Sequence, residues 1–130
     1  MRVKEVMKSV RIMGYDSSAK QAAVLMKKLK IGSIVITDDS RAVGIVTERD
    51  LLTKITAENK LPSKIKIKDI MSRNLITIEP DDSVEDAVYL MIQHKIKKLP
   101  VVKNEELLGI ITSTDLVKNS EEIGEFYFFD

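Results

Sequence analysis

Residues Gly109–Leu116 read GIITSTDL, and residues Gly44–Leu51 read GIVTERDL. Both stretches begin with apolar residues typical of a buried strand and continue into a threonine and, three positions later, an aspartate. These two residue types favour the first turn of a helix, because their side chains pair with backbone groups there. Each stretch is therefore expected to be a strand that leads directly into a helix.

The repeat extends well beyond these two stretches. A shift of 65 residues superimposes residues 16–51 on residues 81–116 with identical residues at 12 of the 36 positions. A shift of 64 residues pairs the lead-in KEVM, residues 4–7, with KDIM, residues 68–71. Such self-similarity indicates a tandem duplication. We assign repeat 1 to residues 1–60, repeat 2 to residues 61–119, and an aromatic C-terminal tail to residues 120–130.

Each copy has the same predicted order of elements, β-α-β-β-α. The helices begin at Ser18 and Ser83, where Ser18 and Gln21 match the capping-box pattern and Ser83 and Asp86 match its acidic variant. The predicted strands include the ranges 34–37, 74–77 and 99–102. The fold class is therefore α/β (α+β), with two small sheets packed with helices. Each copy alone is small for a stable core, so we expect the pair to act together.

The composition excludes several classes of function. The chain of 130 residues has 20 acidic and 21 basic residues, so no overall charge attracts nucleic acid. Cysteine is absent, which rules out thiolate metal sites and a cysteine nucleophile. We expect neither a signal peptide nor a membrane span, and hence a cytoplasmic location. No catalytic set of side chains can be assembled, so an enzyme is not expected, and neither is a metal.

The threonine–aspartate pairs, Thr47 with Asp50 and Thr112 with Asp115, admit two interpretations. They are helix caps and nothing more, or the helix start receives a phosphate while the aspartate accepts hydrogen bonds from a sugar diol. The glycine ahead of each pair removes a side chain where backbone or ligand approaches closely. The residues alone leave both interpretations open.

The repeated Gly-Ile-Ile-Thr-x-x-Asp, the lead-in before each copy and the run Lys97–Val102 (KKLPVV) together resemble a tandem pair of cystathionine-β-synthase (CBS) domains, the Bateman module. The resemblance covers residues 1–119. It implies pseudo-two-fold symmetry and two clefts between the repeats, which commonly hold AMP, ADP, ATP or S-adenosylmethionine as a regulatory ligand. It implies no other cofactor.

The resemblance also implies which residues contact the ligand. The base would be bordered by Ile12, Met13, Ile31 and Ile34 in repeat 1, and by Ile76, Thr77, Ile96 and Leu99 in repeat 2. The ribose and phosphate positions match Thr47, Asp50, Thr112 and Asp115. The expected contacts are completed by Ser33, Arg49, Lys97, Lys98, Pro100, Ser113 and Thr114, among which the two lysines fall where the family often reaches phosphates.

The two copies differ at the phosphate positions. Gly32 and Ser33 stand in repeat 1 where repeat 2 has Lys97 and Lys98, and only Arg49 offers a compensating charge. We therefore expect the two sites to bind a charged nucleotide with unequal affinity.

Three hypotheses about function follow. The leading one is a stand-alone regulatory module that binds an adenosine-containing ligand, forms a homodimer and acts on an unidentified regulated protein. The second is a dimeric interaction scaffold with vestigial clefts. The third is a weak nucleic-acid-binding protein that uses the lysines of the connector, residues 56–68: Lys60, Lys64, Lys66 and Lys68. This hypothesis is less favoured because no aromatic residues interleave with these lysines. The aromatic tail at residues 125–130 is expected to fold over its own core, pack in a dimer or dock on a partner.

Overall fold

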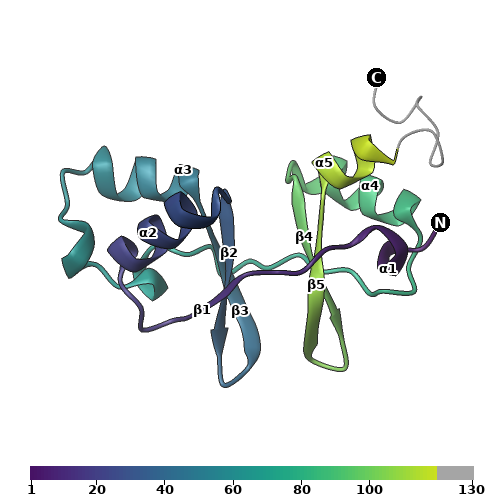
Figure 1. The fold of residues 1–130 in the computed structure, drawn as a ribbon, viewed down its shortest axis with the longest axis horizontal. Coiled ribbons are helices and arrows are strands. Elements are labelled where there is room, and N and C mark those ends of the chain that lie inside the picture. Colours follow the sequence, from purple (N-terminus) through teal and green to yellow (C-terminus); the bar gives the residue numbers. More distant parts are fainter. Residues whose placement is uncertain (120–130) are drawn as a thin grey trace. The chain divides into compact units, whose positions relative to one another are not determined.

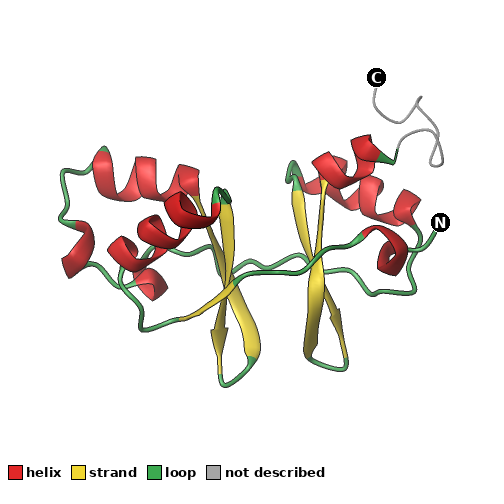
Figure 2. Ribbon diagram, in the orientation of Figure 1, coloured by secondary structure: helices red, strands yellow, loops and turns green. Residues whose placement is uncertain are grey.

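The structure is a computed structural model that describes residues 1–119. The chain forms two compact units (Figure 1). We call residues 11–75 the repeat-1 unit, and residues 1–10 with residues 76–119 the repeat-2 unit. Each unit combines a small sheet with helices (Figure 2), which confirms the predicted fold class. The aromatic tail lies outside the described residues.

The repeat-1 unit contains a three-stranded sheet in the order β1-β2-β3. Its elements are β1 (Ile12–Gly14), α2 (Ala19–Leu29), β2 (Ser33–Asp38), β3 (Arg41–Thr47) and α3 (Glu48–Leu51). β1 is parallel to β2, and β2 is antiparallel to β3. A π-helical turn (Leu52–Thr56) continues α3, and two 3-10 turns (Pro62–Lys64 and Ile67–Asp69) follow in the connector. The core lies between the sheet and the helices, with Ile36 and Val46 fully buried.

Helix α2 begins where the sequence predicts. The Ser18 hydroxyl accepts a hydrogen bond from the Gln21 backbone N–H at 3.1 Å, and the Gln21 side chain accepts one from the Ser18 N–H at 2.8 Å. This reciprocal pair is the predicted capping box. At the start of α4 (Val84–His94) the Ser83 hydroxyl accepts from the Asp86 N–H at 3.1 Å, so the acidic variant also caps its helix.

The repeat-2 unit contains a two-stranded sheet, and the strand expected at residues 74–77 is not formed. Its elements are α1 (Val3–Val6), α4 (Val84–His94), β4 (Lys98–Lys103), β5 (Glu106–Thr112) and α5 (Ser113–Lys118). Next to the expected strand, the single residue Ile78 forms a bridge to β4, at Val101. In repeat 1 the Val35 N–H donates to Arg11 across the β1–β2 pair. Pro100 occupies the position of Val35 and has no N–H, so the ladder loses a bond at this point.

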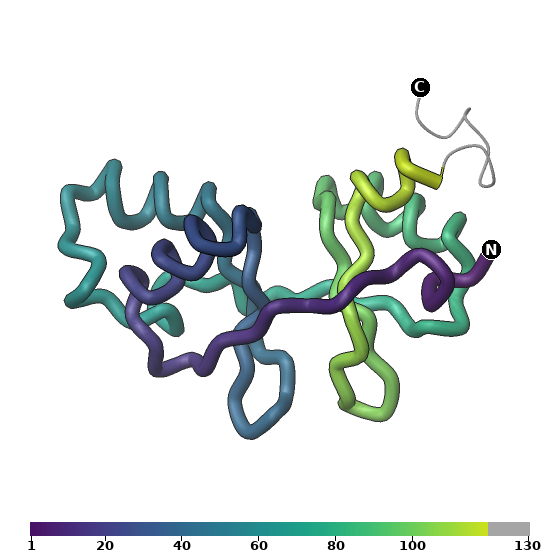
Figure 3. Tube along the Cα trace, in the orientation of Figure 1, coloured from purple at the N-terminus to yellow at the C-terminus, as the bar shows by residue number. Residues whose placement is uncertain are grey.

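The two repeats exchange their lead-in segments. Val3 and Val6 of α1 are buried in the core of the repeat-2 unit, whereas Ile67 and Ile70 are buried in the core of the repeat-1 unit. Lys8 exchanges two backbone hydrogen bonds with Ile110 of β5, at 2.9 and 3.0 Å. Figure 3 shows the N-terminal segment (purple) running across β5 (yellow-green). The compact units therefore do not coincide with the sequence repeats.

The repeated glycine is needed for this exchange. A Cβ atom at Gly109 would lie 2.7 Å from the Lys8 carbonyl oxygen, and one at Gly44 would lie 2.8 Å from the Ser72 carbonyl oxygen. A Cβ atom essentially never lies this close to another heavy atom, so a glycine is needed where each lead-in crosses its strand. The close approach at these glycines is therefore that of the lead-in segment: its backbone at both positions and, at Gly44, also the Met71 sulfur at 2.7 Å.

Each exchanged segment is also held by a repeated ion pair. Lys4 of α1 lies 3.0 Å from the Asp81 carboxylate, which Lys103 also contacts at 3.0 Å. The equivalent pair in the repeat-1 unit is Lys68 with Asp16, at 3.3 Å. The hydrogen bonds from Lys4 and then Lys103 lower the pKa of Asp81 from 3.8 to about 2.

The lowered pKa predicts a loss of stability in acid that depends on Asp81. A carboxyl whose pKa is lower in the folded state stabilises the fold above its unfolded pKa, and this contribution disappears as the pH falls from 3.8 towards 2. We expect Asp81→Asn to lower the free energy of unfolding at pH 6 but not at pH 2. Urea unfolding between pH 2 and 6 measures this, with Glu58→Gln in the exposed connector as the control. Parallel pH profiles for the wild type and Asp81→Asn would contradict it.

Candidate functional site

The threonine–aspartate junctions both form reciprocal caps at the end of a strand. In the repeat-2 unit, Asp115 Oδ2 accepts from the Thr112 N–H at 2.9 Å and from the Thr112 hydroxyl at 2.8 Å, while the Asp115 N–H donates to that hydroxyl oxygen at 3.2 Å. In the repeat-1 unit, Asp50 Oδ2 accepts from the Thr47 N–H at 2.9 Å and from its hydroxyl at 3.2 Å. The capping interpretation is therefore confirmed in both copies.

The second carboxylate oxygen of each aspartate faces a lysine. Asp50 Oδ1 lies 3.2 Å from the Lys54 ammonium, and Asp115 Oδ1 lies 3.5 Å from the Lys8 ammonium. Both lysine side chains are about half exposed, at 46% and 54%, whereas the two carboxylates are 16% and 10% exposed. Ion pairs with such exposed partners contribute only about 0–1 kcal/mol, so a competing donor can replace the lysine at little cost. Capping and ligand binding are thus compatible, because they use different oxygens.

The helix starts offer fewer free N–H groups than the sequence suggests. α3 and α5 are short, and their first N–H groups donate to the preceding connection: Glu48 to the Gly32 carbonyl at 3.1 Å, and Ser113 to the Lys97 carbonyl at 2.9 Å. The third N–H of each helix donates to the threonine hydroxyl. Side chains near the junction therefore matter more to an anion than the helix dipole does.

Lys98 lies beside the repeat-2 junction. It begins β4 directly opposite Thr112 on β5, and Ser33 is the equivalent partner of Thr47. The Lys97 carbonyl accepts a hydrogen bond from the Ser113 N–H at the same junction, and the Lys97 side chain is exposed. The structure thus brings Lys97, Lys98, Thr112, Ser113 and Asp115 together in one unit, while Arg49 and Thr114 are exposed in the first turns of α3 and α5.

The residues expected to border a base differ in their burial. Ile34 and Leu99 are fully buried in the cores of their units, and Pro100 is buried beside Leu99. The partly or fully exposed members are Ile12, Met13 and Ile31 in the repeat-1 unit, and Ile76, Thr77 and Ile96 in the repeat-2 unit.

Lys8 is the polar neighbour that sequence reasoning missed. It reaches Asp115 only because the first lead-in packs on the second repeat, and Ser72 takes the matching bridge position in the repeat-1 unit. The Asp50 carboxylate instead pairs with Lys54 of its own helical segment. No local pattern in the sequence signals this difference between the copies.

Two hollows flank α2 in the repeat-1 unit. One, of about 430 Å³, is lined by Ala23, Met26, Lys27, Lys30, Ile31, Glu48 and Leu51. The other, of about 370 Å³, is lined by Met13, Lys20, Gln21, Val24, Leu25 and Lys28. Each contains one residue expected to border a base, and neither contains the Thr47–Asp50 pair.

Within residues 1–119, no group of histidine and carboxylate side chains is arranged to hold a metal ion. The helices of this part of the chain are also too short and too polar for any of them to cross a bilayer.

The chain belongs to the CBS domain family, because residues 3–57 and residues 67–122 each match it. An uncharacterised protein of Methanopyrus kandleri is 40% identical over 103 residues, which are 78% of this chain and 53% of that protein. The chain thus spans about half the length of this relative.

Solved structures of CBS proteins share the fold over nearly the whole chain. A signal-transduction protein with CBS domains from Burkholderia ambifaria, described as putative, is 25% identical, with a TM-score of 0.85 over 95% of this chain and 96% of that chain. A hexameric CBS-CP12 protein from bloom-forming cyanobacteria is 27% identical, with a TM-score of 0.86 over 95% of this chain and 70% of that chain. The chain is thus a tandem pair of CBS domains, of the kind found in regulatory and signal-transduction proteins.

Proposed function

We propose that this protein is a regulatory module that binds an adenosine-containing ligand at its threonine–aspartate junctions: AMP, ADP, ATP or S-adenosylmethionine. The proposal rests on the partners of the two carboxylate oxygens in Asp50 and in Asp115. Each aspartate holds its helix start through Oδ2, while Oδ1, among the residues that the structure describes, pairs with a half-exposed lysine. A ribose diol can replace that lysine and form charge-assisted hydrogen bonds to the carboxylate.

The chemistry at the junctions is that of binding. In this proposal, Oδ1 of Asp115 accepts a hydrogen bond from a ribose hydroxyl, and Lys97 and Lys98 neutralise the negative charge of the phosphates. Nothing in this set transfers a proton or provides a nucleophile. In this proposal the module acts without catalysis, in the cytoplasm, and ligand binding changes its interaction with a regulated protein.

Calorimetry tests the ligand directly. Purified protein is titrated with AMP, ADP, ATP, S-adenosylmethionine and adenosine, and we expect saturable binding of at least one of them. Protein purified without added ligand is also denatured, and released material absorbing near 260 nm would support the proposal. If none of the five compounds binds, the clefts are vestigial and the scaffold hypothesis takes its place.

Replacing both Lys97 and Lys98 by alanine is expected to weaken ATP binding at one site much more than at the other. An ammonium near a phosphate in a partly screened cleft contributes on the order of 1 kcal/mol or more. Binding of uncharged adenosine should change far less, and the salt dependence of ATP binding should flatten. Lys60→Ala with Lys64→Ala removes the same charge from the exposed connector and serves as the control. ATP affinities equal to those of the wild type at both sites would show that the two lysines do not contact the ligand.

We propose in addition that the protein forms a homodimer. The supporting observation is that α4, a helix of 11 residues, leaves Tyr89 62% and Ile92 69% exposed. Neighbouring large apolar side chains this exposed mark an interaction surface. Light scattering should return twice the monomer mass at micromolar concentration.

The nucleic-acid hypothesis is weakened by the ion pairs that two of the connector lysines form. Lys66 and Lys68 both contact the Asp16 carboxylate, at 3.5 and 3.3 Å, so their charges are partly compensated. Retention on heparin that collapses at moderate salt would favour this hypothesis instead.

A further inference from the structure

A lysine flanks the end of β5 on each of its two edges. Lys98 begins β4 and pairs with Thr112 across the β4–β5 ladder. Lys8 bridges to Ile110 on the other edge of β5, and its ammonium lies 3.5 Å from Asp115 Oδ1. All of these residues belong to the repeat-2 unit, so the unit by itself brings both lysines to its threonine–aspartate junction.

The contact of Lys8 with Asp115 is loose at the side chain and fixed at the backbone. The 3.5 Å between the ammonium and the carboxylate oxygen is longer than an N–H···O hydrogen bond, which spans about 2.7–3.2 Å. The Lys8 side chain is also about half exposed. Its backbone, in contrast, exchanges two hydrogen bonds with Ile110. The ammonium can therefore leave the carboxylate, but it stays within reach of the junction because the backbone is held there.

The lysine at the repeat-1 junction is held more firmly. The Lys54 ammonium lies 3.2 Å from Asp50 Oδ1 and also donates a hydrogen bond to the Ile70 carbonyl at 2.8 Å. Within residues 1–119, the Lys8 ammonium has no second contact of this kind. A ligand that competes for the aspartate therefore displaces Lys8 more easily than Lys54.

The two junctions also differ in charge. Three lysines stand at the repeat-2 junction beside the single carboxylate of Asp115: Lys8, Lys97 and Lys98. Uncharged residues take the equivalent positions in the repeat-1 unit: Ser72, Gly32 and Ser33. The basic residues of that junction, Arg49 and Lys54, are matched by the acidic Glu48 and Asp50. A surplus of positive charge is therefore found at the repeat-2 junction and not at its equivalent.

An adenosine ligand that carries a phosphate offers partners to both members of the Lys8–Asp115 pair. Its ribose diol donates to Asp115 Oδ1 in place of the ammonium, and its 5′-phosphate, a few bonds from the diol, accepts that ammonium. Unphosphorylated adenosine takes the carboxylate and leaves the ammonium without a counter-charge. S-adenosylmethionine has a sulfonium cation where the nucleotides have phosphate, and the lysines repel this cation.

We propose that Lys8 is a further ligand-binding residue, which exchanges the Asp115 carboxylate for a phosphate when the ligand binds. The exchange makes the repeat-2 site selective for AMP, ADP and ATP over S-adenosylmethionine. The inference rests on the function proposed above, in which Asp115 accepts the ribose. It adds a residue that the family resemblance does not imply, and it chooses among the ligand classes that the resemblance leaves open.

Calorimetry tests the exchange, because ATP and adenosine should respond differently. Lys8→Met keeps the apolar stem and removes the ammonium. It should weaken ATP binding at the repeat-2 site, the one that Asp115→Asn weakens, by about threefold to tenfold, as expected for a half-exposed ammonium near a phosphate. Adenosine should bind as well as before or up to about fivefold more tightly, since its competitor for the carboxylate is gone.

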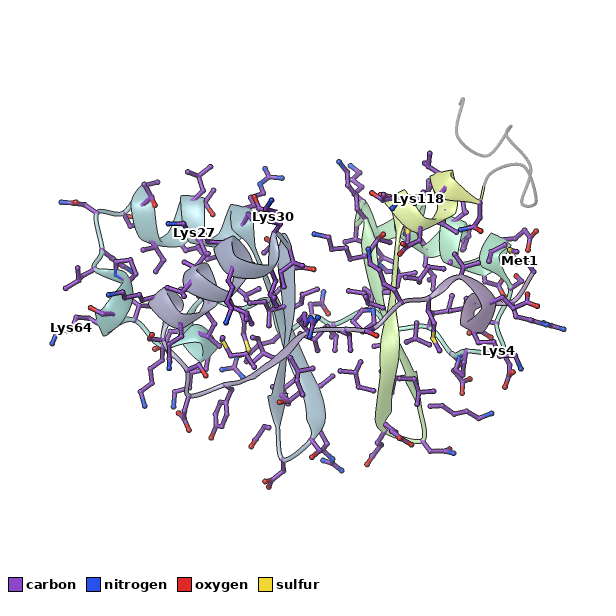
Figure 4. The ribbon with its side chains drawn as sticks, viewed as in Figure 1. Met1, Lys4, Lys27, Lys30, Lys64 and Lys118 are labelled. Atoms are coloured by element: carbon purple, nitrogen blue, oxygen red, sulfur yellow. The ribbon has the colours of Figure 1, made fainter. Side chains whose placement is uncertain are left out.

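Lys4→Met is the matched control. Lys4, labelled in Figure 4, lies on the same lead-in and is 55% exposed, but its ammonium pairs with Asp81. Its replacement removes the same charge and one ion pair, and it should leave both affinities unchanged. Urea unfolding of the two variants verifies that each is folded.

Lysine acetylation gives a second measurement on the wild-type protein. Peptide mass spectrometry follows the reaction at Lys8, with Lys4 as the internal reference. Saturating ATP should slow acetylation of Lys8 but not of Lys4, and saturating adenosine should not protect Lys8.

Three results would overturn the inference and leave the ligand proposal standing. They are an unchanged ratio of ATP to adenosine affinity in Lys8→Met, an unprotected Lys8 under saturating ATP, and a wild-type repeat-2 site that binds S-adenosylmethionine as tightly as ATP. A wild type that binds none of the adenosine compounds would overturn both proposals.

Discussion

Replacing Asp115 by asparagine is expected to lower the affinity of the repeat-2 site for its ligand by about tenfold to a hundredfold while the protein stays folded. The carboxylate would form charge-assisted hydrogen bonds to the ribose, each worth roughly 1.5–3 kcal/mol, and 1.4 kcal/mol corresponds to a factor of ten. Asparagine keeps an oxygen that can accept from the Thr112 N–H, so the helix cap survives. Calorimetry measures the affinity, and urea unfolding measures the stability.

The comparison with alanine separates the two roles of Asp115. Asp115→Ala removes both the cap and the carboxylate, so it should lose the same affinity and, in addition, about 1 kcal/mol of stability. Asp50→Asn is the matched change in repeat 1 and should weaken the other site. If Asp115→Asn and Asp115→Ala both bind as the wild type does, the residue is only a cap.

The local structure of this protein could be predicted from the sequence because the same local patterns occur in both copies of the repeat. The capping residues Ser18 and Thr112 and the strands leading into α3 and α5 all follow from short-range patterns of apolar and capping residues. The missing strand at residues 74–77 had a signal too, since Pro100 cannot supply the ladder donor that Val35 supplies in repeat 1.

The exchange of lead-ins could not be predicted in the same way. Residues 4–7 and 68–71 have nearly the same pattern, so either lead-in could pack on either repeat. The choice depends on contacts between distant segments, such as that of Val3 with the core of the repeat-2 unit. The same packing places Lys8 beside Asp115. The ion pair at the candidate site could therefore not be predicted either, because it depends on contacts between distant segments.

The glycine in the repeated motif shows how structure decides between two interpretations that sequence leaves open. A glycine before a helix start suits close approach by a ligand or by backbone. At Gly109 the nearest atom is the Lys8 carbonyl oxygen, and at Gly44 the nearest atoms are the Met71 sulfur and the Ser72 carbonyl oxygen, so it is the lead-in segments that approach. The glycine of the family motif therefore contributes to the fold here, and the ligand hypothesis rests on the aspartates and lysines.

Replacing Gly109 by alanine is expected to destabilise the repeat-2 unit by about 1–3 kcal/mol, the usual cost of forcing an extra group into a packed site. The new Cβ would meet the Lys8 carbonyl oxygen at 2.7 Å and Met7 Sδ at 3.2 Å. The closer atom is a backbone oxygen that accepts a hydrogen bond from the Ile110 N–H, and the Lys8 N–H donates to the Ile110 carbonyl in return. This oxygen therefore cannot turn away as the end of a flexible side chain would.

Gly14→Ala is the matched control, because nothing lies within 4 Å of the Cβ that it adds. It should be neutral or stabilise the protein by about 0.4–1 kcal/mol, since alanine restricts the unfolded chain more than glycine does. Urea unfolding of the two variants gives the difference, and amide hydrogen exchange of Lys8 and Ile110 shows where it arises. In Gly109→Ala these two amides should exchange faster. Wild-type stability and exchange in that variant would mean that residues 1–10 do not lie across β5.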